Sequence, residues 1–206
     1  MIDRPLPIRL VPGRLEAGVD EVGRGCLAGP VCAAAVILPE DFDLPELNDS
    51  KQLTPARRRA FAQAIITQAI TYSIGEATVE EIDRYNILSA TFLSMERAIR
   101  GLTPQPEHLL IDGNRFKPHT TSIPYETIIK GDGRVASIAA ASVLAKVYRD
   151  HLMEVAAETY PEYGWTHNAG YGTAEHRAAI RAHGITPLHR RSFGPCRPSL
   201  FDAQDF

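Results

Sequence analysis

The chain has the length, composition and charge of an ordinary globular protein. Its 206 residues are 44% hydrophobic and 23% charged, which suffices for one substantial domain with a buried core. The formal net charge of −3 excludes a protein covered in positive potential, so any nucleic-acid binding must come from local clusters of basic residues.

The sequence also argues against a secreted or membrane protein. Residues 1–13 contain an acid, arginines and prolines where a secretory signal needs an unbroken apolar region, and the longest apolar run, 31–38, is too short to span a bilayer. The three cysteines show no CxxC spacing, which argues against a disulfide framework and a zinc site. We therefore expect a cytoplasmic protein with no membrane partner, and a monomer by default.

The first predicted element is a strand over residues 15–22 that carries two adjacent acids near its end. Asp20 and Glu21 repel one another unless a cation neutralises them, and hard divalent ions such as Mg²⁺ and Mn²⁺ are natural partners of oxygen ligands. Arg24, between Gly23 and Gly25, places a fork of donors beside bare backbone N–H groups, which suits a phosphate or a sugar hydroxyl. Taken alone, the acid pair could also be solvated at a strand-to-turn junction.

The acid pair raises a question of geometry. Adjacent strand residues point to opposite faces of a sheet, so Asp20 and Glu21 cannot both face one site from a regular strand. Either the strand bulges here or Glu21 contributes partly through its backbone carbonyl.

Two further strands and three helical segments follow. They are a strand at 31–38 antiparallel to the first, a helix from 55 to about 70, a strand at 72–77, a short helical turn after 78 and an amphipathic helix at 88–100. Thr54 is a typical N-cap for the first helix, and Thr78 with Glu81 forms a capping box. The basic run Arg57 to Arg59 is interpreted as a solvated helix face.

Two later strands again deliver acids. Residues 108–111 lead to Asp112 and residues 125–129 lead to Asp132, and ligands bind at the C-terminal ends of strands in α/β sheets. Each acid has an alternative role, because Asp112 could open a turn and Asp132 could face the dipole of a long helix predicted at 137–159. Small residues in the first half of that helix would let it lie close to a sheet.

The amino-acid composition of the chain changes after residue 160. Glycines are mixed with Tyr163, Trp165 and Tyr171, a helix is predicted at 173–183, and residues 176–201 contain five arginines and three histidines but no acid. We expect residues 161–206 to form a lobe packed on the main sheet, where aromatics beside basic residues could hold a nucleotide.

The four acids Asp20, Glu21, Asp112 and Asp132 together predict a metal site more strongly than any one of them does alone. Four carboxylates delivered by separate strands to one edge suit a pair of divalent ions about 3.5–4 Å apart. Such ions activate a water and stabilise the leaving oxygen of a phosphodiester.

Six motifs resemble, in order, those of bacterial ribonuclease HII and span residues 15–193. They are DEVGRGCLAGP, NDSKQLTP, LLIDGN, IIKGDGRVASIAAASVLAKVYRD, GYGTAEH and HRRSF. The resemblance implies an α/β, ribonuclease H-like fold with a mixed five-stranded sheet flanked by helices. It implies a catalytic core over 1–160 and a small C-terminal helical lobe over 161–206 that binds substrate, together forming a single structural unit.

The resemblance also implies an activity and a set of functional residues. The expected enzyme hydrolyses the RNA strand of RNA–DNA hybrids and incises 5′ of single ribonucleotides in duplex DNA, leaving a 3′-hydroxyl and a 5′-phosphate, and so removes misincorporated ribonucleotides and RNA primers. The implied catalytic and metal-binding acids, for Mn²⁺ or Mg²⁺, are Asp20, Glu21, Asp112 and Asp132. The implied readers of the 2′-hydroxyl at the RNA–DNA junction are Gly23, Arg24 and Gly25, and Tyr171 is the implied stacking partner of the next sugar. The implied phosphate or duplex contacts are Lys51, Ser142, Lys146, Arg190 and Arg191.

Alternatives remain open at this point. The chain could be another nuclease or a nucleotidyl transferase of the same fold acting on DNA alone, or a non-catalytic nucleic-acid-binding module whose acids cap turns. Lys146 could be a solvated helix lysine. The related ribonuclease HIII type lacks the arginine of the GRG motif and carries an extra N-terminal domain, and neither feature fits. The terminal residues SLFDAQDF do not clearly spell a sliding-clamp-binding peptide, so a clamp partner is unsupported.

Overall fold

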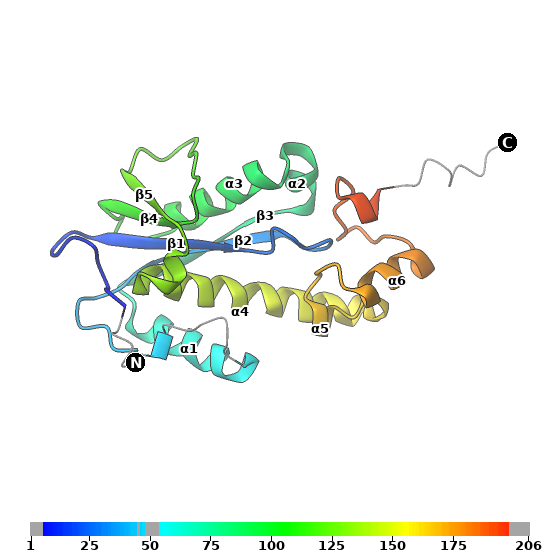
Figure 1. The fold of residues 1–206 in the computed structure, drawn as a ribbon, viewed down its shortest axis with the longest axis horizontal. Coiled ribbons are helices and arrows are strands. Elements are labelled where there is room, and N and C mark those ends of the chain that lie inside the picture. Colours follow the sequence, from blue (N-terminus) through cyan, green and yellow to red (C-terminus); the bar gives the residue numbers. More distant parts are fainter. Residues whose placement is uncertain (1–5, 45, 48–53, 198–206) are drawn as a thin grey trace.

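A five-stranded mixed sheet in the order β3-β2-β1-β4-β5 organises the molecule (Figure 1). The computed structural model describes residues 6–44, 46–47 and 54–197. Its strands are β1 (Glu16–Val22), β2 (Val31–Ile37), β3 (Thr71–Ala77), β4 (His108–Asp112) and β5 (Tyr125–Ile128). β1, β2 and β3 pair antiparallel, whereas β1, β4 and β5 pair parallel. The predicted mixed sheet is confirmed, and the acid-bearing strand β1 lies at its centre.

Helices cover both faces of this sheet. They are α1 (Pro55–Gln68), α2 (Val79–Tyr85), α3 (Ile87–Arg100), α4 (Ala136–Thr159), α5 (Trp165–Asn168) and α6 (Ala174–His183). α1 and α4 lie on one side of the sheet and α2 and α3 on the other (Figure 1). The predicted caps are present, since the Thr54 hydroxyl accepts from the Arg57 N–H at 3.3 Å and Thr78 and Glu81 form the reciprocal capping box.

The start of α4 lies unusually close to β1 because glycine occupies the contact. A Cβ added to Gly18 would stand 2.2 Å from the backbone carbon of Ser137, which no side chain tolerates. The small residues Ala139, Ala140 and Ala141 continue this close approach and are fully buried. The helix is thereby held at a fixed height over the strand that carries Asp20 and Glu21.

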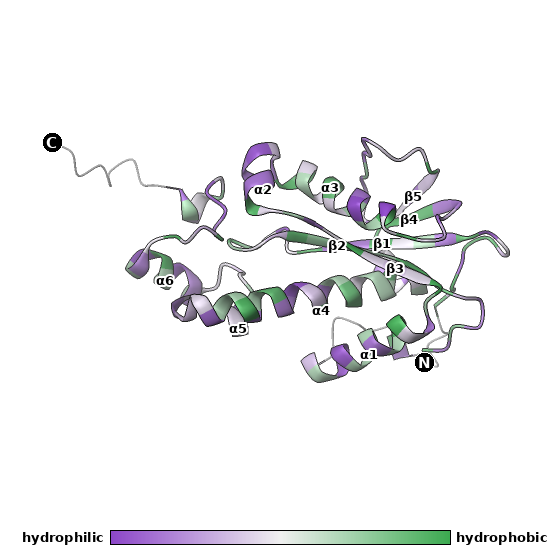
Figure 2. Ribbon diagram, turned by 180° about the vertical axis from the view of Figure 1, so that it is seen from behind, coloured by the Kyte–Doolittle hydropathy of each residue, from purple (hydrophilic) through white to green (hydrophobic). Residues whose placement is uncertain are grey.

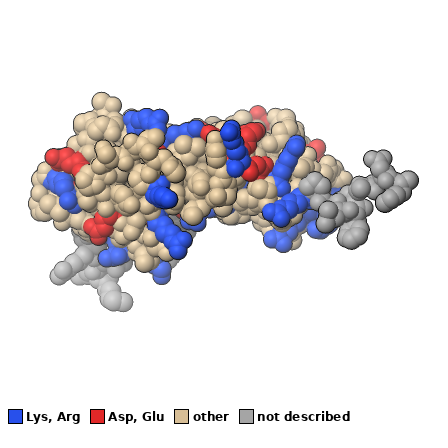
Figure 3. Space-filling model, turned by 90° about the horizontal axis from the view of Figure 1, so that it is seen from above, with Lys and Arg blue, Asp and Glu red and all other residues tan. Residues whose placement is uncertain are grey.

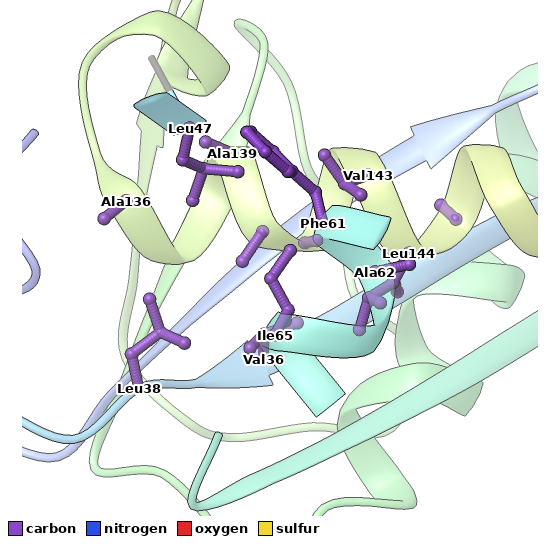
Figure 4. Close-up of a cluster of buried hydrophobic side chains, with 14 residues drawn as sticks. Val36, Leu38, Leu47, Phe61, Ala62, Ile65, Ala136, Ala139, Val143 and Leu144 are labelled. Carbon is purple, nitrogen blue, oxygen red and sulfur yellow. The ribbon is translucent and has the colours of Figure 1, made fainter. Parts of the chain in front are cut away.

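Two apolar layers complete the core. Below the sheet, Phe61 and Ile65 of α1 meet Val143 of α4 and Val36 of β2 (Figure 4). Above it, the predicted stripe of α3, including Phe92 and Met95, packs on Val19 and its neighbours. Phe92, Met95 and Ile99 are core, as their helical spacing predicts, whereas Leu88 in the first turn of the same stripe is 36% exposed.

Residues 161–197 form the lobe, which packs on α4 and on the glycine-rich loop after β1, residues 23–30. Its Phe193 also packs against the cluster that holds Val31 of β2 and Ala77 of β3. α4 has 24 residues and is about 36 Å long, whereas a seven-residue strand spans about 23 Å, so the helix extends past the sheet. The projecting half presents Met153 and Ala157, which pack with Tyr163 and Trp165 of the lobe and with Ala28 of the loop. The lobe therefore reaches the end of the sheet at which β1 stops.

Polar and apolar surfaces are divided as expected for a globular fold. The outer helices α2 and α6 are mainly hydrophilic, while hydrophobic segments concentrate on β1, β2 and α4 (Figure 2). Among the described residues, we find no helix with the length and apolar character needed to cross a bilayer.

Candidate active site

The parallel pairing of β1 with β4 brings the first two acids together. The last registered pair is Val19 with Ile111, so Asp20 and Asp112 follow side by side at the C-terminal ends of both strands. Asp132 arrives from the short 3₁₀-helix η2 (Gly131–Gly133), which directly precedes α4. The two positions are linked by a hydrogen bond from the Gly131 N–H to Asp112 Oδ1 at 2.6 Å.

All four predicted acids line one cavity of about 350 Å³. Asp20 and Asp132 are 6% and 8% exposed, so neither is a solvated turn acid. The cavity is bounded by Asp20, Glu21, Val22, Arg58, Asp112, Asp132, Ser142, Val143, Lys146 and Tyr171. The structure thus gathers side chains from β1, β4, η2, α1, α4 and the lobe around a carboxylate-rich space.

Glu21 stands on the opposite side of β1 from Asp20. The β1–β2 register is regular through both acids, so the strand bulge considered from the sequence is wrong. Glu21 also borders a second cavity of about 280 Å³ on the α3 side, together with Asp112, Arg24 and Arg115. Its carboxylate accepts from Arg24 Nη1 at 3.0 Å. Glu21 and Asp112 therefore face both cavities, at the end of the strands where the two spaces approach one another.

The carboxylates are held at an electrostatic cost. Burial raises the pKa of Asp20 well above its ordinary value, and the nearby Glu21 and Asp112 raise it further. Burial also raises the pKa of Glu21, against a lowering by Arg24. A divalent cation would relieve this repulsion, and a set of carboxylate oxygens is the donor chemistry that Mg²⁺ and Mn²⁺ prefer.

The carboxylates as they stand are engaged with local partners. Asp20 Oδ1 accepts from the Glu21 N–H at 2.7 Å, and Glu21 is held by Arg24. Within the described part of the chain, no three His, Cys, Asp or Glu side chains lie in an arrangement that could already hold a metal ion. The chemistry of the donors fits a hard divalent ion.

Two buried arginines, Arg149 and Arg190, donate hydrogen bonds to the backbone carbonyls of the glycine-rich loop after β1, residues 23–30. Gly23 has φ +93°, and a Cβ there would lie 2.2 Å from Arg149 Nε. Arg149 donates to the carbonyls of Pro30, Ala28 and Ala169 at 3.0, 2.8 and 2.7 Å. Both its guanidinium and that of Arg190 are fully buried, and among the described residues neither forms an ion pair with a carboxylate.

Arg190 corrects one expectation from the sequence. It was predicted to contact a duplex, but it is 0% exposed and donates to the carbonyls of Gly29, Arg24 and Pro30 at 2.8–3.1 Å. Burial lowers the pKa of Arg190 to about 10, so it still carries its charge at neutral pH. Its role is to hold the loop that carries Arg24, while the neighbouring Arg191 is exposed.

The lobe contributes Tyr171 to the acid cavity. This tyrosine is 39% exposed, and Lys146 Nζ lies 5.6 Å from its ring centroid. Lys146 also pairs with Asp150 at 2.7 Å. Ser142, one turn earlier on α4, hydrogen-bonds Asp20 and lowers its pKa, although burial outweighs this effect. The other two aromatics expected to hold a nucleotide, Tyr163 and Trp165, are instead buried in the core of the lobe.

One residue that borders the acid cavity is not distinguished by the sequence, and one predicted contact lies outside the described residues. Arg58 was interpreted as part of a solvated face, but its side chain is only 15% exposed and borders the acid cavity. No local pattern separates it from Arg57 and Arg59, because only the packing of α1 against α4 turns it inward. Lys51, a predicted phosphate contact, lies outside the described residues.

Comparisons with known proteins agree with this arrangement. The family profile described as Ribonuclease HII matches residues 17–196. A ribonuclease HII from Parabacteroides distasonis is 59% identical over 181 residues, covering 88% of this chain and 90% of the relative. A solved PCNA:RNase HII complex from Archaeoglobus fulgidus contains a chain that is 25% identical with a TM-score of 0.73, covering 90% of this chain and 98% of that one.

A more distant likeness supports the fold. The crystal structure of Bst-RNase HIII in complex with Mn²⁺ matches with a TM-score of 0.71 at 19% identity, covering 91% of this chain and 69% of that one. The solved structures confirm the predicted ribonuclease H-like fold. Given a profile that spans residues 17–196 and a relative this similar, the chain belongs to the ribonuclease HII family of metal-dependent endoribonucleases, which act on the RNA of hybrids.

Proposed function

We propose that this enzyme also incises duplex DNA on the 5′ side of a single embedded ribonucleotide, leaving a 3′-hydroxyl and a 5′-phosphate. Its role would be to remove misincorporated ribonucleotides and RNA primers. The observation that carries the proposal is the shared cavity, in which four carboxylates meet Tyr171 beside the Gly23–Gly25 loop. A general RNA-strand nuclease needs the acids, whereas selecting one ribonucleotide also needs groups that read its sugar.

Asp20, Glu21, Asp112 and Asp132 are the residues proposed to hold two divalent ions, Mn²⁺ or Mg²⁺. When bound, such ions supply an activated water and neutralise charge on the leaving oxygen of the phosphodiester. The protein's own contribution is to place the carboxylates at the ends of rigid strands, so that little rearrangement of the backbone is needed. Lys146 and Ser142, on the first half of α4, are placed to contact a phosphate beside them.

The glycine-rich loop is proposed to read the 2′-hydroxyl. That hydroxyl is what separates a ribonucleotide from a deoxyribonucleotide sugar, so it must be met by donors and acceptors at close range. Arg149 and Arg190 bind the carbonyls of the loop from the inner side, where Gly23 leaves room for the Arg149 side chain. Gly25 faces open space, so no side chain covers the backbone there. Tyr171 then offers a ring face for the following deoxyribose.

One assay tests the proposal directly. A labelled duplex holding one ribonucleotide is incubated with wild-type protein and with the D20N variant, in Mn²⁺ or in chelator, and the scission point is mapped. We expect a cut on the 5′ side of the ribonucleotide with wild type and metal, and a loss of about 10³-fold or more in rate for D20N with binding retained. Cleavage of an all-DNA duplex by wild type would favour a nuclease of DNA, and cleavage retained by D20N would refute the assigned metal site.

Partners and location follow from the same proposal. We propose that the enzyme acts as a monomer on RNA–DNA hybrids and on ribonucleotide-containing duplexes, with basic residues gathered on the face of the lobe end seen in Figure 3. The Archaeoglobus fulgidus relative was solved with PCNA, but the terminal segment weighed for clamp binding lies outside the described residues. Three free, buried cysteines support placing the enzyme in the reducing cytoplasm.

A further inference from the structure

The backbone that carries Tyr171 is fixed by three separate parts of the protein. Arg149 of α4 donates to the Ala169 carbonyl at 2.7 Å, and the Leu27 N–H of the glycine-rich loop donates to the Gly170 carbonyl at 2.8 Å. His176 of α6 contacts the third consecutive carbonyl, that of Tyr171, through Nδ1 at 2.9 Å. Three successive carbonyls are therefore each held by a different element.

This segment needs such support because its conformation is strained. Ala169 has φ +46° and Gly170 has φ +80°, two successive residues in the left-handed region. A non-glycine residue there costs on the order of 1–3 kcal/mol and persists only when its surroundings enforce it. The turn lifts Tyr171 out of the lobe, so that its ring lines the acid cavity.

The tautomers of His176 and His189 follow from two neighbouring N–H groups that can only donate a hydrogen bond. The Thr186 N–H must donate, and it does so to His189 Nδ1 at 2.9 Å, so the proton of neutral His189 is on Nε2. His189 Nε2 lies 3.0 Å from His176 Nε2, which also receives the Trp165 indole N–H at 3.1 Å. His176 Nε2 is thus an acceptor, and its own proton is on Nδ1, facing the Tyr171 carbonyl.

The whole network is sealed from solvent. Trp165 and His176 are 0% exposed and His189 is 1% exposed. Burial lowers the pKa of both histidines, that of His189 to about 4, which keeps the pair neutral and the tautomers fixed. The Nδ1–H of His176 is consequently a permanent donor toward the carbonyl of Tyr171.

We propose that His176 is a positioning residue that sets Tyr171 for recognition of the RNA–DNA junction. This inference rests on the proposed function, because it concerns how one ribonucleotide is selected rather than how a phosphodiester is cut. His176 lies behind the tyrosine and does not line the acid cavity, so its effect reaches substrate only through Tyr171. Losing the hydrogen bond should lower selectivity for a lone ribonucleotide more than cleavage of a continuous hybrid.

Two nearly matched variants separate positioning from stability. In H176N the side-chain amide takes the place of Nδ1 and can still donate to the Tyr171 carbonyl, while in H176Q the amide takes the place of Nε2 and cannot. Both lose part of the buried network, so both should lose a similar amount of thermal stability. We expect the ratio of kcat/KM on a single-ribonucleotide duplex to that on an all-RNA hybrid to fall about tenfold in H176Q and to stay within about threefold of wild type in H176N.

The Tyr171 background supplies the decisive control. In Y171A the ring is absent, so the H176N and H176Q changes should give the same substrate ratio, and the exposed His183 on the same helix provides H183N as a neutral comparison. The proposal is overturned if H176N and H176Q give the same ratio with Tyr171 present, or if their difference persists in Y171A.

A measurement on the unmodified protein covers the case in which the variants do not fold. Nitrogen-15 NMR of the histidine rings in wild type should show His176 protonated on Nδ1 and His189 protonated on Nε2. If His176 were instead protonated on Nε2, no donor would face the Tyr171 carbonyl, and the proposal would be refuted. If instead wild type cuts neither substrate while the tautomers are as assigned, the proposed function fails and the structural assignment stands.

Discussion

At the scale of single residues, Asp20 shows how the site opposes the stability of the fold. Its carboxylate is buried, and burial together with Glu21 and Asp112 raises its pKa. The ionised Asp20 is less stable in the folded protein than in the unfolded chain, where water solvates the carboxylate and the other acids are distant. The buried charge therefore lowers the free energy of unfolding. Groups arranged for function in this way commonly lower stability.

We therefore expect D20N to be more stable than wild type in the absence of metal. The gain should be about 1–2 kcal/mol in the free energy of unfolding near pH 7, measured by urea denaturation in chelator. Adding Mn²⁺ should stabilise wild type more than D20N and so reduce the difference. The exposed Asp41 gives D41N as a control with no comparable gain, and a D20N variant less stable than wild type would contradict the strain inferred here.

Among the helices and strands, a feature was predictable from the sequence when the residues that determine it are close together along the chain. Strands β1 to β5 and the capped helices were predictable because alternation and capping residues act within a few positions, as Thr78 and Glu81 do. The four acids were also found, since each ends or follows a predicted strand. The inward turn of Arg58 and the burial of Arg190 were not predictable, because both depend on partners far along the chain.

The lobe should be the part of the protein most sensitive to acid. Burial lowers the pKa of His189 from the ordinary 6.5 to about 4. Between these two pH values His189 is protonated in the unfolded chain and neutral in the folded lobe. The contribution of this neutral pair is complete above pH 6.5 and is lost as the pH falls from 6.5 to about 4. The loss should amount to about 1–3 kcal/mol.

Fluorescence can follow this loss directly. Trp165 is the only tryptophan and is fully buried beside His176, so its emission during urea titration reports on the lobe. We expect the lobe's unfolding midpoint to fall between pH 6.5 and pH 4 in wild type and to change less in H189Q. H183Q, at an exposed position, should follow wild type, and equal pH dependence in wild type and H189Q would rule out His189 as the source.

At the scale of the whole molecule, binding of nucleic acid must overcome a net charge of −3. Only local basic residues can do so, and each phosphate they neutralise releases counterions and steepens the dependence on salt. With Arg190 buried, Arg191 is the exposed member of the pair predicted to contact a duplex.

Salt titration tests that assignment. In the D20N background, which prevents cleavage, R191A should bind a ribonucleotide-containing duplex more weakly and reduce the slope of log K against log salt by about one. R100A removes an exposed arginine near Thr120, outside the residues that line the acid cavity, and should leave the slope unchanged. An unchanged slope in R191A would mean that this arginine touches no phosphate.

The support of the loop by Arg149 and Arg190 has a consequence for rearranging the protein. The arginines come from α4 and from the lobe, and they bind carbonyls contributed by the loop and by Ala169. Cutting the chain at residue 160 would remove the Ala169 carbonyl, one of the three acceptors of Arg149. It would also remove Arg190, which donates to the carbonyls of Arg24, Gly29 and Pro30. A shortened protein keeping only 1–160, or a chimera that imports a relative's lobe without its matching loop, should retain the four acids yet lose the contour that admits a ribose.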